Sequence, residues 1–467
     1  MDQSPASFRA TISSMNYNVK LVFLYNFFQS VGRGVWMGNV LTAYIYLLTQ
    51  SPLVVGLSSA ATGLTMTIVV FPSGALADRF RREWMLRGAT VFGILALIIT
   101  SFANQIEAFL IALVFWGLFQ GMTRPSLEAL FADSVESGIR SKIYSWRHLV
   151  RQVAMASGPF LNVILFLILG DIWDLSILKA VMIVGLIISM ISLVIMIFFK
   201  DHKSLGAKSE SLTYSAENSN NNDNYQSTNS YINSSSSLPN NSFSSSFSSK
   251  HRLNFAKFSI TNSPRAGKIV LILVACNVII GFGAGMTVKY FTLFFMEIYL
   301  LQPVMVQLIM GFVSIFTGIS AIIAQKFSMG RGRAQMIFVV QGLATICLAM
   351  IALYPPLWLL IPIFLARGSL MNSSQPLSRS ILMDVVPKRS RGKINSVEAL
   401  AWGLFWNVSA VLGGILVGPT LNFRLCFIVT TGLYVIGTLP VLLLIPLVAR
   451  EKSAQLETQE KSPSPIP

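Results

Sequence analysis

Apolar runs of about 20 residues, the length that spans the hydrocarbon core of a bilayer as an α-helix, recur along nearly the whole chain. Short polar breaks separate them. Only 12% of the residues are charged and 53% are hydrophobic, whereas an ordinary soluble domain has roughly a quarter charged residues. This composition excludes a soluble globular protein. The recurrence predicts an all-α membrane protein with a bundle of spans rather than a single membrane anchor.

The sequence predicts twelve spans and therefore an integral, multi-pass membrane protein. They cover residues 20–48, 53–76, 85–103, 106–132, 146–169, 176–199, 268–297, 304–325, 334–354, 357–384, 395–419 and 424–448. Basic residues cluster in the loops after spans two, four, six, eight and ten, whereas the opposite connections are nearly bare. By the positive-inside rule, the basic loops and both tails, residues 1–19 and 449–467, face the cytoplasm.

The net charge of +16 follows this topology, because most of the excess of Lys and Arg lies in alternate loops. We therefore expect no nucleic-acid partner. A Ser/Asn-rich tract, residues 218–249, interrupts the helical pattern, and such a composition buries too little apolar surface to offset chain entropy. Residues 200–267 are expected to be a disordered cytoplasmic linker between two six-helix halves, residues 20–199 and 268–448. The tract favours a eukaryotic protein of the plasma membrane or of an endosomal or vacuolar membrane.

An internal repeat supports the division into two pseudo-symmetric halves. One offset, 251 residues from Pro125 to Pro376, aligns Gly117–Ile143 with Gly368–Ile394 without a gap. The same offset aligns three further pairs in the segment and three in spans one and seven: Asp133 with Asp384, Arg140 with Arg391, Lys142 with Lys393, Asn26 with Asn277, Gly32 with Gly283, and Gly34 with Gly285. Repeats of this kind are typical of duplicated transporters, whose binding site lies between the halves.

The segment after span two reads GALADRFRR and resembles the signature loop of the major facilitator superfamily, a Gly, then Asp-Arg/Lys, then Gly-Arg-Arg/Lys. Arg81 stands where the family usually has Gly, and residues 325–333 are a decayed copy in the second half. The resemblance covers all twelve spans and implies no particular substrate. In the family this loop ties helix ends together on the cytoplasmic side and controls the switch between inward-open and outward-open states. The residues that it implies for gating are Gly74, Asp78, Arg79 and Arg82.

Two acid–arginine pairs at the ends of spans four and ten are further gating candidates. Asp133 with Arg140 and Asp384 with Arg391 have equal spacing and resemble the latches of sugar-porter members. A carboxylate such as Asp78 can accept hydrogen bonds from the free amides of a helix N-terminus, or pair with a basic side chain, only while the helix ends are together. For the loop after span two, the alternative is a plain basic loop without a gating role.

Charges inside the spans indicate the binding site, because a charge in hydrocarbon is costly unless it is paired or faces a cavity. Arg33 lies about 20 Å into span one at ~1.5 Å per residue. In the family, spans one, four, seven and ten line the central cavity, which makes Arg33, Arg124, Lys289 and Arg367 the candidate substrate-binding residues. Glu128 and Glu398 are the candidate coupling residues. Arg147, His148 and Arg151, at the start of span five, are expected to reach the cytoplasmic interface.

The cations outnumber the deep carboxylates, and a cavity of positive potential favours an anionic solute. Two alternatives stay open. Polar neighbours such as Gln29, Asn39, Asn372 and Gln375 can satisfy Arg33 and Arg367. Glu128 can also pair with Arg379, its equivalent under the repeat.

The predicted function is secondary active transport of a small solute by alternating access, with an organic anion as one candidate. The alternatives are a drug or metabolite–proton antiporter, since Gly158-Pro159 partly matches the antiporter pattern in span five, and a transporter-like sensor that moves nothing. The chain contains no P-loop, metal-ligand cluster or nucleophile–base constellation, so we expect neither an enzyme nor a cofactor or metal. The expected partners are the solute, membrane lipid and, as an open candidate, a coupling proton, with the protein as a monomer.

Overall fold

The computed structural model describes residues 15–135, 140–205, 264–386 and 388–448, with the backbone alone at 78–79, 140–142, 145, 264, 388–400 and 402. These residues form helices without strands. The helices are α2 (Tyr17–Trp36), α3 (Asn39–Thr49), α4 (Pro52–Arg79), α5 (Arg82–Phe102), α6 (Ile106–Ser134), α7 (Arg140–Leu169), α8 (Leu175–Ile197), the 3-10 turn η1 (Asp201–Lys203), α10 (Pro264–Val288), α11 (Phe291–Glu297), α12 (Pro303–Arg331), α13 (Arg333–Ile351), α14 (Leu357–Val385), α15 (Lys388–Val417) and α16 (Phe423–Thr438).

Twelve spans in two halves of six are the architecture, which confirms the predicted fold class. Nine helices in the described residues are long and apolar enough to cross a membrane by length and composition. The other spans are the first, which is broken, and the tenth and eleventh, α14 and α15. Residues 206–263 of the predicted linker lie outside the described residues, as do 1–14 and 449–467 of the predicted tails.

The boundaries differ from the predicted ones where a capping residue extends a helix. Span one begins at Tyr17 rather than at residue 20, because the Asn16 side chain accepts a hydrogen bond from the Asn18 amide at 2.9 Å. Span seven begins at Pro264, a residue favoured in the first turn of a helix. Residues 264–267 are therefore helix and not linker.

Spans one and seven are each broken toward the C-terminal end of the span, which the apolar pattern did not predict. The first break, at Met37–Gly38, separates α2 from α3, and the second, at Lys289–Tyr290, separates α10 from α11. Gly38 and Lys289 are 251 residues apart, so the two breaks obey the internal repeat. Broken helices at the interface of repeated halves mark binding sites in many transporters.

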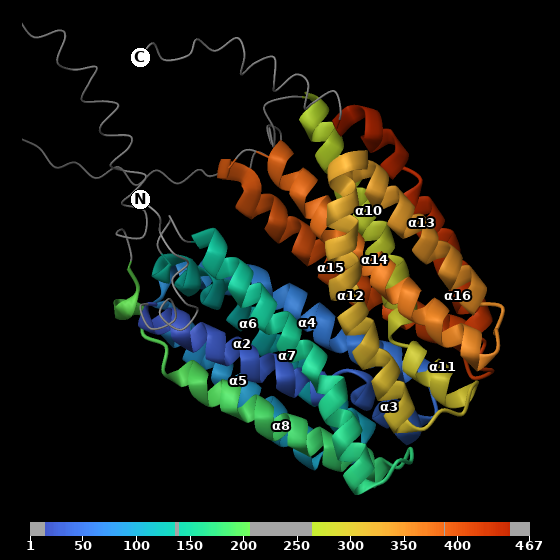
Figure 1. Ribbon diagram of the computed structural model, residues 1–467. Helices are drawn as coiled ribbons and strands as arrows, with labels where there is room; N and C mark the ends of the chain where they lie inside the picture. The colour runs from blue at the N-terminus through green and yellow to red at the C-terminus, as the bar shows by residue number, and fades with distance from the viewer. Residues whose placement is uncertain (1–14, 136–139, 206–263, 387, 449–467) are drawn as a thin grey trace, which may run out of the picture.

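The two halves meet through α4 against α15 and α7 against α12. At one end of the bundle α3 also contacts α11, and from there the ribbons of the halves diverge (Figure 1). We call the diverging end, which carries Phe80–Arg82 and Gly332, the basic end, and the other, which carries Gln50 and Leu300, the opposite end.

Hydrogen bonds hold the halves together toward the opposite end. Trp173 Nε1 donates to the Leu301 carbonyl at 2.7 Å, and the Val304 amide donates to Asp171 Oδ1 at 2.8 Å. The hydroxyl of Tyr290 lies 3.2 Å from the carbonyl of Pro52 in the other half, and 2.5 Å from the carbonyl of Ala410 in its own half.

Candidate functional site

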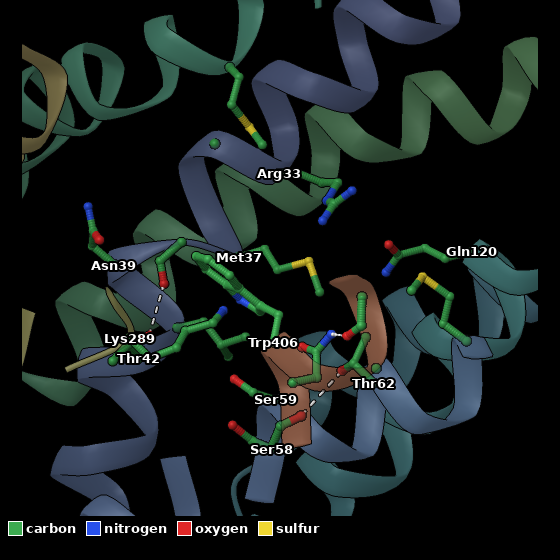
Figure 2. A pocket seen from close by; sticks show the side chains of 18 of the residues that line it. Arg33, Met37, Asn39, Thr42, Ser58, Ser59, Thr62, Gln120, Lys289 and Trp406 are labelled. Carbon is green, nitrogen blue, oxygen red and sulfur yellow. Dashed lines mark hydrogen bonds between the residues drawn. The ribbon is translucent and has the colours of Figure 1, made fainter. Parts of the chain in front are cut away.

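A cavity of about 770 Å³ lies between the halves, and nine helical segments contribute to its wall. Its lining carries five cationic side chains from both halves: Arg33 on α2, Arg124 on α6, Arg151 on α7, Lys289 at the break before α11, and Arg379 on α14. Among the described residues, the lining contains no Asp or Glu. The remaining wall mixes hydroxyl and amide groups with methionines and Trp406 (Figure 2).

Glycines on either side of Arg33 pack α2 closely against α7 and α8. A Cβ on Gly32 would lie 2.3 Å from Ser189 Oγ of α8, and one on Gly34 would lie 3.1 Å from Gly158 Cα of α7. Small residues allow such close approach of helices in membranes. The sequence could not show that these glycines serve helix packing rather than access to the Arg33 backbone.

The guanidinium of Arg33 points into the open region of the cavity (Figure 2). Its Nε is buried without a hydrogen-bond partner, and no described carboxylate lies within 4.0 Å of the group. Gln29, offered as a satisfying neighbour, instead accepts a hydrogen bond from Ser192 at 2.5 Å. Asn39 accepts from Thr292 at 3.1 Å. These two amides therefore bond elsewhere.

Lys289 reaches the same cavity because the break in span seven interrupts the helix at this residue. Arg33 lines this cavity as well, so two like charges face the same space. Like charges close together in a half-buried site raise each other's free energy. An anion between them would lower that free energy.

Arg124, Arg151 and Arg379 are exposed to the cavity. Arg151 was expected to reach the interface, yet it lies 11 residues into α7, about 16 Å at ~1.5 Å per residue, which is deep enough to meet the cavity. The depth of Arg151 within span five was the feature of the sequence that could have indicated a cavity residue. A pair of Glu128 with Arg379 was the open alternative, but Glu128 binds Arg147 through both oxygens, at 2.7 and 2.5 Å.

Arg367, by contrast, is not part of the cavity lining. Its side chain is 5% exposed within the C-terminal half, where Nη2 donates to the Tyr434 hydroxyl at 3.0 Å. The guanidinium lies 4.8 Å from the centre of the Phe291 ring. The structure thus brings three of the four candidate substrate-binding residues together and places the fourth among aromatic side chains.

The gating candidates lie at the basic end. Gly74 of α4 faces α6, where a Cβ on this glycine would lie 4.0 Å from the Cβ of Pro125. Asp133 forms an ion pair with Arg82, and Asp384 forms the equivalent pair with Arg333 at 2.5 Å. The other candidates are placed by backbone only, and their side chains lie outside the described residues: Asp78 and Arg79 at the end of α4, Arg140 at the start of α7, and Arg391 and the coupling candidate Glu398 in α15.

Both ion pairs obey the repeat, because Arg82 and Arg333 are also 251 residues apart. Each arginine makes a second contact at equivalent positions: Arg82 with the Ala129 carbonyl at 3.4 Å and Arg333 with Ser380 Oγ at 3.0 Å. The duplication is therefore visible in the side-chain contacts as well as in the sequence.

Comparison with solved structures shows the same fold in several transporters. The chain is similar to the nucleoside transporter NupG, at 10% identity and a TM-score of 0.62 over 91% of this chain and 98% of that one. It is similar to a bacterial homologue of the human lysosomal transporter Spinster in an inward-facing, occupied conformation, at 13% identity and 0.64 over 96% and 98%. A D-xylose–proton symporter matches at 14% identity and 0.63 over 91% and 96%.

No curated protein matches the sequence. The sequence profile of the Major Facilitator Superfamily does match, over residues 22–397 and 273–467. Together these two ranges run from span one to the end of the chain. The chain is a multi-pass membrane protein that belongs to the Major Facilitator Superfamily.

Proposed function

We propose that this protein is a secondary active transporter that carries an organic anion by alternating access through the cavity between its halves. One observation carries the proposal: five cationic side chains line that cavity, and no acidic side chain does so in the described part of the chain. A charge inside the membrane is costly unless a partner or water compensates it. An anionic solute supplies that partner for the length of the transport cycle.

The charge pattern of the lining opposes a cationic drug as the solute, because the potential of the cavity repels cations. The same charge pattern is compatible with coupling of transport to protons. Glu128 remains a candidate for coupling even though it is paired with Arg147, since protonation of Glu128 would release Arg147. A sensor that moves nothing would bind the anion without flux into vesicles.

The basic end faces the cytoplasm in this proposal, because the loops there carry most of the Lys and Arg. The cavity is then closed toward the other side by the contacts of Trp173, Asp171 and Tyr290. Transport requires these contacts to break while the basic ends come together. Asp78 and the pairs of Arg82 and Arg333 with their aspartates are the residues proposed to control that step.

The test is a thermal-stability screen of the purified protein with organic anions and with neutral and cationic analogues of similar size. A ligand that binds the folded state raises its apparent stability by mass action. We expect stabilisation by anions only, loss of this effect in Arg33→Gln, and flux of the stabilising anions into vesicles. Lys268→Gln, which removes an exposed cation outside the cavity, is the matched control. Equal stabilisation by neutral analogues would reject an anion as the solute.

A further inference from the structure

The five cations of the cavity form a continuous series rather than one cluster. Counted along their helices, Lys289 lies farthest from the basic end and Arg33 next, followed by Arg151 and Arg124, and Arg379 lies nearest to that end. The series thus leads from the helix break before α11, through α2, α6 and α7, to α14 on the other half.

Two groups can be distinguished within the series by exposure. The inner group, Arg33 and Lys289, is half-buried, whereas the outer group, Arg124, Arg151 and Arg379, is exposed to the cavity. Arg33 lies near the middle of span one, and Lys289 directly follows α10, closer to the opposite end. The outer group lies on parts of α6, α7 and α14 that are closer to the basic end.

No described carboxylate forms an ion pair with a cation of either group. Glu128 is the one carboxylate that acts on Arg124 and Arg151 among the described side chains, and both of its oxygens bind Arg147. The described ion pairs include none of the five cavity cations. A single monovalent anion would therefore leave most of this positive charge uncompensated when the cavity closes and excludes water.

The uncharged part of the cavity wall suits an organic framework. Met37, Met66, Met155 and Met310 all line the cavity, and methionine side chains adapt to apolar groups of different shape. Gln120 and Asn407 provide neutral polar contacts beside them. Small inorganic anions would leave this surface without contact in a cavity of about 770 Å³.

We propose that the solute is an organic molecule with two separated acidic groups, one bound by Arg33 and Lys289 and the other by Arg124, Arg151 and Arg379. This inference rests on the proposed function and adds the substrate class to it. Because Arg379 belongs to the C-terminal half and Arg124 and Arg151 to the N-terminal half, the outer acid also neutralises the repulsion between halves. A bound dianion therefore favours closure of the basic end more than the empty cavity does.

The test compares diacids with monoacids of the same skeleton on the purified wild-type protein. The probes are glutarate, adipate and pimelate, each with its monomethyl ester. Hydrogen bonds to a charged group typically change affinity by about tenfold or more. We expect at least one diacid to stabilise the protein at a concentration about tenfold lower than its monoester does, and to enter vesicles faster.

Variants assign the two groups. Arg124→Gln and Arg151→Gln should weaken binding of the diacid more than binding of the monoester, and so reduce the preference for diacid. Arg33→Gln should weaken both probes. Arg124→Lys, which retains the charge, should retain most of the preference, and Lys268→Gln should behave as wild type. If a variant fails to fold, the comparison of diacids with monoesters on the wild-type protein still tests the proposal.

The outcomes separate this inference from the proposed function. Monoesters that bind and move as well as the diacids would overturn the dianion while supporting an organic anion. An absence of stabilisation by every acid in the series, with neutral compounds stabilising, would overturn both. A diacid preference that survives both Arg124→Gln and Arg151→Gln would remove the outer group from the site.

Discussion

Arg33 and Arg367 are both arginines deep within spans, and the protein accommodates their charges in different ways. Arg367 is enclosed, donates to Tyr434 and lies over the ring of Phe291, so aromatic side chains compensate the guanidinium. Nε lacks a hydrogen-bond partner in both arginines, and Arg33 differs in that its guanidinium faces the cavity. The first arrangement supports a structural role for Arg367. In the second arrangement, a bound solute can supply the partner that the Arg33 guanidinium lacks.

Arg367→Gln should lower stability without changing solute specificity. The substitution removes a buried charged hydrogen bond and a cation–π contact, which together are typically worth about 1–3 kcal/mol. Thermal unfolding of the purified variant measures this loss, and the anion screen measures specificity on the folded fraction. Tyr434→Phe, which removes the acceptor alone, should have a smaller effect. Unchanged unfolding together with a lost response to anions would instead assign Arg367 to the solute.

Arg33→Lys should impair transport while leaving the unliganded protein about as stable as wild type. Lysine keeps the charge but loses the planar pair of donors that suits carboxylates. Arg33→Ala should likewise fold, because no described carboxylate depends on Arg33. Flux and anion-induced stabilisation are the measurements. Destabilisation by Arg33→Ala that Glu398→Gln then relieves would show an internal partner instead.

At the scale of elements, the repeat places one ion pair at the basic end of each half. Arg82 at the start of α5 binds Asp133 near the end of α6, and Arg333 at the start of α13 binds Asp384 near the end of α14. Each pair therefore ties the beginning of one span to the end of the next. This arrangement keeps the basic ends of those helices together when the halves move.

Reversal of one charge in either pair should slow transport, and reversal of both should restore it. Arg82→Asp and Asp133→Arg test the first half, and Arg333→Asp with Asp384→Arg is the matched test in the second. Because both pairs are partly exposed, the coupling energy should be modest, about 1 kcal/mol or less. Vesicle flux and a double-mutant cycle on thermal unfolding provide the measurements. Double reversals as slow as the singles would exclude the pairing as the cause.

The sequence predicted the spans and the repeat but not which side of each helix faces the cavity. Apolar residues face both lipid and neighbouring helices, so hydrophobic periodicity contains little information on rotation in a membrane. For this reason Arg151 was missed as a cavity residue, and the partners of Glu128 and Asp133 could not be identified. The breaks at Gly38 and Lys289 were missed because the apolar runs continue through them.

At the scale of the whole molecule, hydrogen bonds between the halves are confined to one side of the helix breaks in the described residues. They join Asn39 to Thr292, Asn162 to Gln307, and Tyr290 to Pro52, besides the contacts of Asp171 and Trp173. Most of these residues lie close to the opposite end. In the proposed alternating-access cycle, these contacts hold the opposite end closed and must break before that end opens.

Asp171→Ala combined with Trp173→Phe should shift the population toward a state open at the opposite end. The pair of substitutions removes two hydrogen bonds to the start of α12, at Leu301 and Val304. Their loss, roughly 1 kcal/mol each, changes the ratio of two states by about tenfold or more.

A single cysteine at Gln375, which lines the cavity, reports that shift. The native cysteines Cys276, Cys347 and Cys426 are first replaced, and an impermeant thiol reagent is then added to either side of sealed vesicles. Labelling should increase from the side of the opposite end and decrease from the side of the basic end. Asp174→Ala is the matched control in the same loop, because Asp174 accepts hydrogen bonds from Ser176 and Ile177 within its own half.

The same control has a pH dependence of its own. The hydrogen bonds from Ser176 and Ile177 hold the pKa of Asp174 below its ordinary value, so its stabilising effect is present at neutral pH and lost as the pH falls through that lowered pKa. Asp174→Ala should thus lower the unfolding temperature at neutral pH and leave the side of labelling unchanged. If the double variant and Asp174→Ala label alike, general loosening of the loop accounts for the accessibility, and the contacts of Asp171 and Trp173 do not hold the opposite end closed.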